Sequence, residues 1–320
     1  MKYEQRSRAE IFAENQAAHF IAEALPWVKA IAGKTVVIKY GGSAMVDEKL
    51  RSDVMSDIVL LKLMGVNPVI VHGGGAAISE VMERFGLPVE FVDGLRVTSE
   101  AAMDIVRMVL VGQVNQELVT AMNMHGNFAV GVSGSDAGTV IATQADPRLG
   151  RVGKVTGVSS DYIDALIQDG YIPVIASVAM GDDGGFFNVN ADAVAGEIAA
   201  AIGAQKCVFL TDVDGIYEDF SDKATLISNM TLDEAKDMVA SGAMSKGMIP
   251  KLQACITSLE KGVSRTHVIN GTTHHAIILE LLTDAGIGTV IHRTREAYDY
   301  ENHPLGPVAS KLVENLDERD

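Results

Sequence analysis

The feature that most constrains the fold is a regular alternation of short apolar runs with longer helical stretches, from Thr35 to Ile291. The apolar runs are rich in Val and Ile and cover residues 35–39, 68–71, 128–132, 172–178, 207–210, 267–269 and 288–291. The helical stretches cover residues 47–64, 99–124, 161–168, 191–202, 231–241 and 247–261. Uninterrupted apolar strands separated by helices are typical of parallel sheets buried on both faces. We therefore predict an α/β protein, a three-layer αβα sandwich around a mainly parallel open sheet.

The chain is long enough for two lobes, because 320 residues is about twice the length of an ordinary domain. No segment rich in Pro or Ser divides it. We place the boundary at about Ala204, so that residues 31–204 form one lobe and residues 205–320 the other. The last part of the second lobe, residues 292–320, is polar and is expected to extend beyond the sheet.

Residues 1–30 precede the first strand and are predicted to form a separate helix. Ser7–Glu10 has the pattern of a capping box, and Pro26 is expected to interrupt the helix. Apolar side chains recur at helical spacing and are numerous for a free helix: Ile11, Phe12, Ala18, Phe20, Ile21 and Leu25. Such a helix packs either on its own subunit or on another one, and the sequence leaves both open.

Charge and cysteine content exclude several classes of function. Forty-two acidic residues against 26 basic ones give a net charge of −16, which repels nucleic acid backbones and anionic lipid. The two cysteines, Cys207 and Cys255, form neither a zinc-binding pattern nor a disulfide framework. The first residues are charged, and no apolar run approaches the roughly 18 residues of a membrane span. We expect a soluble protein of the reducing cytoplasm, with no nucleic acid or membrane partner.

Three glycine-rich turns directly follow predicted strands, at Lys39–Ser43, His72–Gly75 and Gly131–Asp136. Ligands of open α/β sheets bind beyond the carboxyl ends of the strands, where glycine lets backbone N–H groups approach an anion. A single such turn is usually plain turn chemistry. Three together, with a lysine in the first, favour an anion-binding site.

Familiar nucleotide and hydrolase motifs are incomplete. Gly33-Lys34-Thr35 is similar to the end of a P-loop, but Val28 stands where the first glycine is required and a strand follows. His72–Gly75 is similar to the oxyanion segment of esterases, yet Ser135 spoils the Gly-x-Ser-x-Gly pattern of their nucleophile turn. A hydrolase stays an alternative that lacks its nucleophile motif.

Two further segments carry polar groups at predicted helix starts. In Asn188–Asp192, the side chains can cap the helix or present amides and a carboxylate to a ligand, and capping is the commoner use. In Lys246–Lys251, a lysine in the first helical turn opposes the helix dipole. That placement indicates an anion nearby, although a solvated surface lysine is the ordinary case.

Six motifs follow one another between about Val36 and Ile291: Lys39–Gly42, His72–Gly75, Gly94–Thr98, Asn188–Asp192, Thr211–Ile216 and Gly247–Lys251. Together and in this order they resemble the N-acetyl-L-glutamate kinase family of the amino acid kinase superfamily. One position departs from the family's pattern, because Lys246 stands where the first glycine of a Gly-Gly-Met run is common. The departure concerns the backbone of that turn and leaves Lys251 in place.

The resemblance implies phosphoryl transfer from ATP, accompanied by Mg²⁺, to the side-chain carboxylate of N-acetyl-L-glutamate, a step of arginine biosynthesis. A carboxylate with a pKa near 4.3 is already ionised at neutral pH, so the reaction needs no general base. It needs alignment and positive charge around the transferring phosphoryl group. We expect Lys39 and Lys251 to supply that charge and Asp192 to hold both ammonium groups.

The resemblance also implies the binding residues, with the amino acid in the first lobe and the nucleotide in the second. Arg96 suits a bidentate grip on the substrate's α-carboxylate. The other residues expected to bind the amino acid are Gly74, Gly75, Asn188 and Asn190. Those expected to bind the nucleotide are Gly41, Gly42, Asp212, Asp214 and Lys251. No protein ligand of Mg²⁺ is assigned, since phosphate and water can supply most of its shell.

Several alternatives stay open. Within the superfamily, the kinases of aspartate, glutamate, carbamate and UMP share glycine-rich turns and lysines, whereas Gly94–Thr98 with Asn188–Asp192 favours the acetylated substrate. From another class, the chain could be a catalytically silent sensor of amino acids and nucleotides. A silent sensor would have lost a phosphoryl-clamping residue, and Lys39, Asp192 and Lys251 are all present.

The helix before the first strand bears on regulation. In the family that the chain resembles, such a helix accompanies homohexamers, trimers of dimers, that are inhibited by arginine. The segment His275–Thr289 also resembles the effector region of that type, with Glu280, Gly286 and Gly288 as candidate effector residues. Its ordinary interpretation is a surface helix and turn. A PII-type signal protein is a conceivable partner that no feature of the sequence supports.

Overall fold

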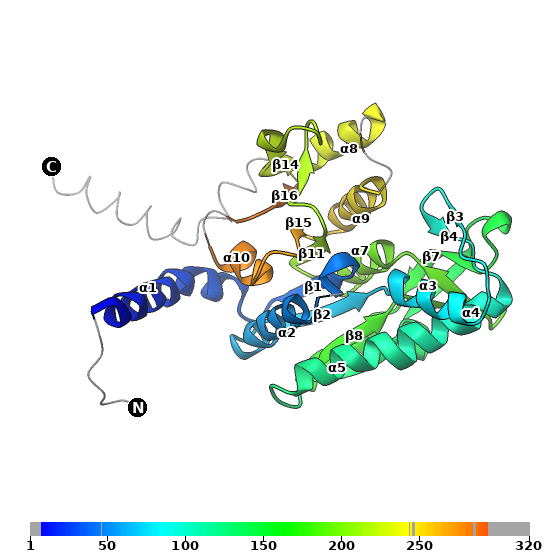
Figure 1. Ribbon diagram of the computed structural model, residues 1–320, viewed down its shortest axis with the longest axis horizontal. Coiled ribbons are helices and arrows are strands. Elements are labelled where there is room, and N and C mark those ends of the chain that lie inside the picture. Colours follow the sequence, from blue (N-terminus) through cyan, green and yellow to red (C-terminus); the bar gives the residue numbers. More distant parts are fainter. Residues whose placement is uncertain (1–7, 46, 243, 245–246, 284–285, 294–320) are drawn as a thin grey trace.

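The computed structural model describes residues 8–45, 47–242, 244, 247–283 and 286–293. Its centre is an eight-stranded sheet of order β14-β16-β15-β11-β1-β2-β8-β5 (Figure 1). These strands are Asn229–Thr231, Thr289–His292, Arg265–Asn270, Lys206–Thr211, Thr35–Tyr40, Asn67–His72, Ile172–Ala176 and Ala129–Ser133. Every neighbouring pair is parallel except β15 and β16, which are antiparallel. The prediction of a mainly parallel sheet is confirmed.

Helices cover both faces of the sheet, as predicted (Figure 1). One face carries α2 (Glu48–Leu63), α5 (Asn115–Asn123) and α10 (Ala276–Leu282). The other carries α6 (Asp161–Gln168), α7 (Ala191–Ala201), α8 (Leu232–Ser241) and α9 (Ile249–Glu260).

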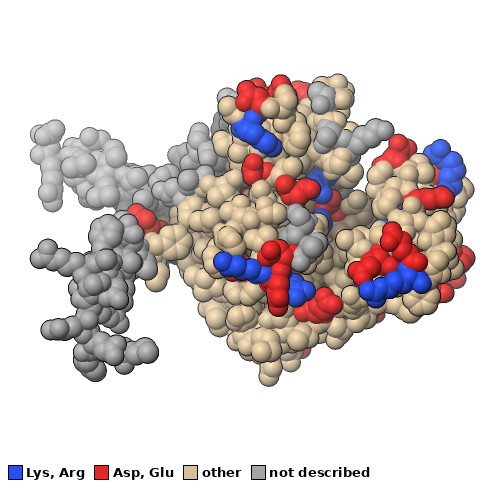
Figure 2. Space-filling view, viewed as in Figure 1, with Lys and Arg blue, Asp and Glu red and all other residues tan. Residues whose placement is uncertain are grey.

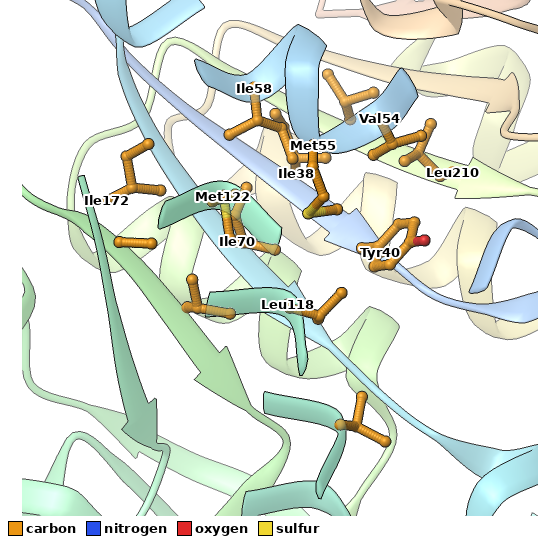
Figure 3. Packing of buried hydrophobic residues seen from close by; sticks show 14 of the residues in the cluster. Ile38, Tyr40, Val54, Met55, Ile58, Ile70, Leu118, Met122, Ile172 and Leu210 are labelled. Atoms are coloured by element: carbon orange, nitrogen blue, oxygen red, sulfur yellow. The ribbon is translucent and has the colours of Figure 1, made fainter. Parts of the chain in front are cut away.

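Strand β1 shows why three layers form, because its side chains alternate between two apolar clusters. Ile38 and Tyr40 pack with Met55 and Ile58 of α2 (Figure 3). Val37 belongs to the cluster on the opposite face. Since successive side chains of a strand point to opposite faces, an apolar run is buried on both only between two helix layers.

The strands that precede Ala204 occupy one end of the sheet, β1-β2-β8-β5, and those that follow it occupy the other. The boundary of two lobes at this residue stays a prediction.

Cys207 and Cys255 are both buried and unpaired. Among the described residues no helix is long and apolar enough to cross a membrane.

Some elements differ from those predicted. The apolar run 172–178 is divided, because β8 ends at Ala176 and a separate strand, β9 (Val178–Gly181), follows. With β6 (Val140–Gln144), β7 (Val152–Val158) and β10 (Phe186–Val189), β9 closes a small barrel that we did not predict. Also unpredicted are α3 (Gly75–Arg84) and two short hairpins, β3–β4 (Phe91–Val92, Leu95–Arg96) and β12–β13 (Ile216–Tyr217, Leu226–Ile227).

The predicted helix over 99–124 is continuous but irregular. It consists of α4 (Glu100–Arg107), a π-helical segment η2 (Met108–Val114) and α5. A π-helical turn holds more residues than an α-helical turn, so it changes the direction in which every later side chain points.

The prediction that Pro26 interrupts the amino-terminal helix is wrong. Helix α1 (Arg8–Ile31) continues through Pro26. Ala24 and Ile31 flank this proline and are buried, so tertiary packing offsets the backbone hydrogen bond that proline cannot make. Phe20, Ile21 and Leu25 are exposed, while Ser7 and the side chains of Ile11, Phe12 and Ala18 lie outside the described part. Figure 1 shows α1 extending away from the sheet beyond α10.

Candidate active site

Three predicted catalytic residues from three elements meet at the carboxyl end of β1. The Nζ atom of Lys39 lies 3.0 Å from Oδ1 of Asp192, and the Nζ atom of Lys251 lies 3.0 Å from Oδ2. Their side chains are 10%, 6% and 18% exposed for Lys39, Asp192 and Lys251. A nearly buried carboxylate therefore holds two ammonium groups of which neither is fully enclosed.

Local structure explains how these residues come together. Lys39 precedes the end of β1, and Asp192 and Lys251 stand in the first turns of α7 and α9. Burial opposes the ionisation of Asp192, but the two lysines outweigh it and hold the pKa of this carboxyl below its ordinary value. The anion expected beside a lysine in a first helical turn is thus Asp192 itself.

The first glycine turn lies against this group. A Cβ atom on Gly41 would lie 3.1 Å from Nζ of Lys39, so a side chain there would press on the ammonium group. Gly42 has φ of +73°, which favours glycine, and it is exposed. Gly41 is therefore beside the Lys39 ammonium group, and Gly42 follows it in an exposed turn.

The second glycine turn leads into α3 and meets Arg96. The Nη2 group of Arg96 donates to the backbone oxygen of Gly75 and to Oγ of Ser79, both at 2.7 Å. The guanidinium carbon lies 4.7 Å from the centre of the Phe91 ring. Burial lowers the pKa of Arg96, and among the described residues no carboxylate pairs with it. A cation held by neutral groups beside the start of a helix is suited to an anionic ligand.

The predicted asparagines have different surroundings. Asn188 donates through Nδ2 to Oγ1 of Thr98 at 3.1 Å, and its backbone N–H donates to the oxygen of Arg151 at 2.8 Å. Asn190 is the N-cap of α7, because its Oδ1 accepts from the N–H groups of Asp192 and Ala193 at 2.8 and 3.2 Å. Capping, the commoner use of such a residue, is the observed one here, and substrate binding by Asn190 stays a prediction.

The predicted nucleotide carboxylates follow β11. Asp212 accepts from Oγ1 of Thr211 at 3.1 Å. Asp214 accepts from the hydroxyl of Tyr217 at 2.6 Å and from Nδ2 of Asn270 at 2.8 Å. The bond from Tyr217, followed by that from Asn270, lowers the pKa of Asp214. Asp214 is thus held by neighbouring side chains of its own half of the chain.

A cavity that we did not predict lies next to Asp214. Its volume is about 350 Å³, and its lining is mainly apolar: Gly215, Ile216, Tyr217, Glu218, Phe220, Glu234, Asp237, Met238, Ser241, Met244 and Met248. Phe220 packs edge-on against Tyr217, with Lys223 above both rings. The apolar residues come from β12, α8, the N-cap of α9 and the segments between these elements, so their sequence positions carried no common signal.

The three predicted effector residues lie together on the other side of β15. Oε1 of Glu280 is 2.7 Å from Nδ1 of His267, and Oε2 accepts from the backbone N–H groups of Ile287 and Gly288 at 2.8 and 3.2 Å. Gly286 has φ of +58°, and a Cβ atom there would lie 3.0 Å from Oε2 of Glu280. His267, with its Nε2 buried and without a hydrogen-bond partner, was not predicted as part of this group.

The surface agrees with the charge balance of the sequence. Figure 2 shows many acidic side chains on the visible face, and a hollow in it where basic and acidic atoms lie side by side. Among the described residues no group of three or more His, Cys, Asp or Glu side chains could hold a metal ion.

Comparisons with known proteins agree with this geometry. The model of the amino acid kinase family matches residues 34–270. The acetylglutamate kinase of Caldanaerobacter subterraneus subsp. tengcongensis is 51% identical over 89% of this chain and 95% of its own length. That of Thermosynechococcus vestitus is 46% identical over 90% of this chain and 98% of its own.

Solved structures show the same fold at lower identity. N-acetylglutamate synthase from Neisseria gonorrhoeae, in complex with coenzyme A and N-acetyl-glutamate, has a TM-score of 0.76 at 22% identity, over 87% of this chain and 63% of that one. Carbamate kinase from Giardia lamblia bound to AMP-PNP has a TM-score of 0.63 at 17% identity, over 82% and 99%. With its family match, its relatives and its two lysines joined by one aspartate, the chain belongs to the amino acid kinase family and, within it, to the acetylglutamate kinases.

Proposed function

We propose that the protein transfers the γ-phosphoryl group of ATP to the side-chain carboxylate of N-acetyl-L-glutamate, as a step of arginine biosynthesis. The observation that carries the proposal is the pairing of Asp192 with Lys39 and Lys251, at 3.0 Å each. The acetylglutamate kinases that are 46–51% identical to this chain support the choice of substrate.

Phosphoryl transfer to a carboxylate requires cations around the transferring group and no general base. A carboxylate oxygen of the substrate forms a bond to the γ-phosphorus while the bond from that phosphorus to the leaving ADP oxygen breaks. The nucleophile is ionised at neutral pH, so no proton has to be removed. Lys39 and Lys251 neutralise charge on the transferring group, and Asp192 keeps them at a fixed spacing.

In this proposal the amino acid binds between Arg96 and Asn188. Arg96 grips the α-carboxylate, since it is a buried cation whose described partners are all neutral. Asn188 offers its carboxamide to the acetylated nitrogen. The backbone N–H groups of Gly74 and Gly75 bind the reacting carboxylate at the start of α3.

The nucleotide is assigned to the other half of the sheet. Gly41 and Gly42 bind its phosphates together with Lys251, and Asp212 and Asp214 lie on its ribose side. The mainly apolar cavity at Tyr217 and Met248 suits the adenine ring. Mg²⁺ accompanies ATP on the phosphate oxygens, where this ion keeps several waters.

Arginine is proposed to inhibit the enzyme through the group formed by Glu280, Gly286 and Gly288. Their mutual contacts, and the packing of α10 against α1, support a link between this group and the amino-terminal helix. The exposed Phe20, Ile21 and Leu25 support the use of α1 as a contact between subunits, in a hexamer built from three dimers. We also propose that the enzyme acts in the cytoplasm.

The alternatives predict different reactions. Kinases of glutamate, aspartate, carbamate or UMP would turn over those acceptors, none of which is acetylated, and the similarity to carbamate kinase extends to the fold alone. A silent sensor would bind nucleotide without turnover. The intact arrangement of Lys39, Asp192 and Lys251 favours a catalyst over a sensor.

The test is an assay of purified protein with ATP and Mg²⁺ that measures ADP release with each acceptor and in which hydroxylamine traps any acyl phosphate. We expect product with N-acetyl-L-glutamate and little with glutamate, aspartate, carbamate or UMP. Comparable turnover of free glutamate would contradict the assigned substrate, and ADP release without trapped product would contradict the reaction. The Lys34→Ala variant serves as a matched control, because Lys34 precedes β1 and lies outside the site.

A further inference from the structure

His72 and Asn115 form a buried polar pair beneath the second glycine turn. His72 is the last residue of β2, and its side chain is fully enclosed. Its Nδ1 atom lies 2.9 Å from the backbone oxygen of Gly73, and its Nε2 atom lies 3.0 Å from Nδ2 of Asn115. The same Nδ2 atom donates to the backbone oxygen of Val174 at 2.8 Å. The pair therefore connects β2, β8 and the long helix.

The hydrogen bonds define where the protons are. The oxygen of Val174 can only accept, so the amide nitrogen of Asn115 must face it, and that nitrogen can only donate. The Nε2 atom of His72 is then the acceptor and carries no proton. A neutral imidazole has its hydrogen on Nδ1 in that case, and this N–H donates to Gly73. Burial, which lowers the pKa of His72 to about 4, keeps the ring neutral.

The bond from His72 fixes the orientation of one peptide group. In a planar trans peptide, the C=O of Gly73 and the N–H of Gly74 point in opposite directions. Holding the oxygen toward His72 therefore turns the N–H of Gly74 away from it. Glycine on both sides of a peptide lets it rotate more freely than any other pair of residues would. His72 thus selects one of two orientations that the turn itself would allow.

The π-helical segment supplies the rest of this support. A Cβ atom on Gly74 would lie 2.7 Å from Cδ2 of Leu110 and 3.2 Å from Cγ2 of Val114, so both side chains pack directly on the turn. Asn115 is the residue that follows η2. A Cβ atom on Gly131 of β5 would lie 2.1 Å from Oδ1 of Asn115. Glycine at this position therefore leaves room for the Asn115 carboxamide. The irregular part of the helix thus meets the turn at Leu110 and Val114, and the residue after it, Asn115, meets His72.

We propose that His72 and Asn115 are positioning residues for the reaction, which direct the N–H of Gly74 toward the reacting carboxylate of the substrate. The inference rests on the proposed function, in which that N–H binds the substrate. Neither side chain touches substrate. They act through the peptide between Gly73 and Gly74.

Two substitutions of His72 separate positioning from packing. The side-chain nitrogen of Asn occupies the place of Nδ1, so His72→Asn keeps a donor for Gly73. The end of a Gln side chain occupies the place of Nε2, so His72→Gln keeps an acceptor for Asn115 and loses that donor. We expect His72→Asn to stay within about threefold of the wild-type kcat/KM for N-acetyl-L-glutamate. We expect His72→Gln to lose about a hundredfold, the order for one lost backbone donor, with KM for ATP unchanged.

A spectroscopic measurement tests the inference independently of activity. In protein with ¹⁵N-labelled histidine, the His72 ring should show the Nδ1–H form, unchanged between pH 6 and 8. In Asn115→Leu, which removes the donor to Nε2, the Nε2–H form should appear and the amide resonance of Gly74 should shift.

Several results would overturn the inference. One is a His72 ring with its proton on Nε2 in the wild type. Another is an equal loss of kcat/KM in His72→Asn and His72→Gln. The third is an amide resonance of Gly74 that does not shift in Asn115→Leu. Absence of phosphoryl transfer by the wild type would instead contradict the proposed function, and the ring measurement would still decide the arrangement of the turn.

Discussion

At the scale of single residues, Asp192 forms ion pairs with the ammonium groups of two lysines, which would otherwise repel each other. In the proposed reaction each lysine stands where charge develops on the phosphoryl group, and each comes from a different half of the chain. An interaction that is stronger in the transition state than in the ground state appears in kcat rather than in KM. The two lysines should therefore behave alike in kinetics although they share no sequence motif.

We predict that Lys39→Ala and Lys251→Ala each lower kcat by about a hundredfold or more, because each removes one transition-state donor. Kinetics under saturating ATP and N-acetyl-L-glutamate measure the effect, and circular dichroism confirms the fold. Lys34→Ala should keep the wild-type kcat. A Lys39→Ala or Lys251→Ala enzyme with near-normal kcat would show that the lysine concerned is an ordinary ion-pair partner of Asp192.

Arg96 should respond differently, because in the proposed function it holds the substrate in the ground state and in the transition state equally. We predict that Arg96→Lys raises KM for N-acetyl-L-glutamate and leaves KM for ATP almost unchanged, since an ammonium cannot reproduce a bidentate grip. Initial rates with each substrate varied in turn measure this. A selective defect toward ATP would place Arg96 in the nucleotide site instead.

The sequence predicted the charged members of the site better than the neutral ones. Lys39 and Lys251 stood out because one belongs to a glycine-rich turn and the other to a first helical turn, where a cation is less favoured, whereas the role of Asp192 came from the family resemblance. Asn190 shows the opposite case. A carboxamide at a helix start can cap the helix or bind a ligand, and the sequence is the same for both uses. His72 and Asn115 are far apart in sequence, and only the fold shows that they face one another.

At the scale of elements, periodicity predicted every strand of the main sheet except β14, and most of its helices, including the helix over 47–64 that the structure has at Glu48–Leu63. It missed α3, because that helix begins inside the glycine turn at Gly75. It also missed the small barrel, whose strands such as β7 contain glycine and polar residues and lack a continuous apolar run. The π-helical segment has no residue pattern of its own, since it differs from an α-helix only in hydrogen bonding.

Helix α1 gives the prediction at this scale. Removal of residues 1–25 deletes the exposed Phe20, Ile21 and Leu25 and should convert hexamers into active dimers that have lost inhibition by arginine. Light scattering measures the mass, and a titration with arginine measures the sensitivity. If the full-length protein is already dimeric, or if millimolar arginine does not change its activity, α1 serves another purpose.

At the scale of the whole molecule, side chains join the two ends of the sheet on the face opposite α7 and α9. Nδ1 of His275, the N-cap residue of α10, lies 2.8 Å from Oδ1 of Asp57 in α2. His274 contacts Asp53 in the same helix, and Asp53 also lies 3.9 Å from Nε2 of His275. Asp57 is almost completely buried, whereas the His275 side chain is half exposed.

This contact makes stability depend on pH. The hydrogen bond with Asp57 raises the pKa of His275 above its ordinary value, against the opposing effect of burial. A raised pKa contributes stability that is complete below about pH 6.5 and is lost as the pH rises through the pKa of the folded state. Burial raises the pKa of Asp57 itself, and His275 opposes this.

We predict that the melting temperature of His275→Gln lies below that of the wild type at pH 6 and approaches it at pH 9. Thermal unfolding between pH 5.5 and 9 measures the difference. His125→Gln, which changes an exposed histidine after α5, should show no such trend. A difference for His275→Gln that stays constant or grows toward pH 9 would contradict the assigned charge.

The position of β1 in the middle of the sheet has a consequence for synthesis of the chain. Its neighbours are β2, which follows closely in sequence, and β11, which begins only at Lys206. When β8 has been made, at Ala176, β1 still presents an unpaired edge of Val and Ile until Thr211 emerges. At about 5–20 residues per second, this interval lasts about 2–7 s on the ribosome. During that time the nascent first half exposes an edge on which a neighbouring chain can pair, so chains crowded on a polysome should aggregate more readily than the finished protein does at the same concentration.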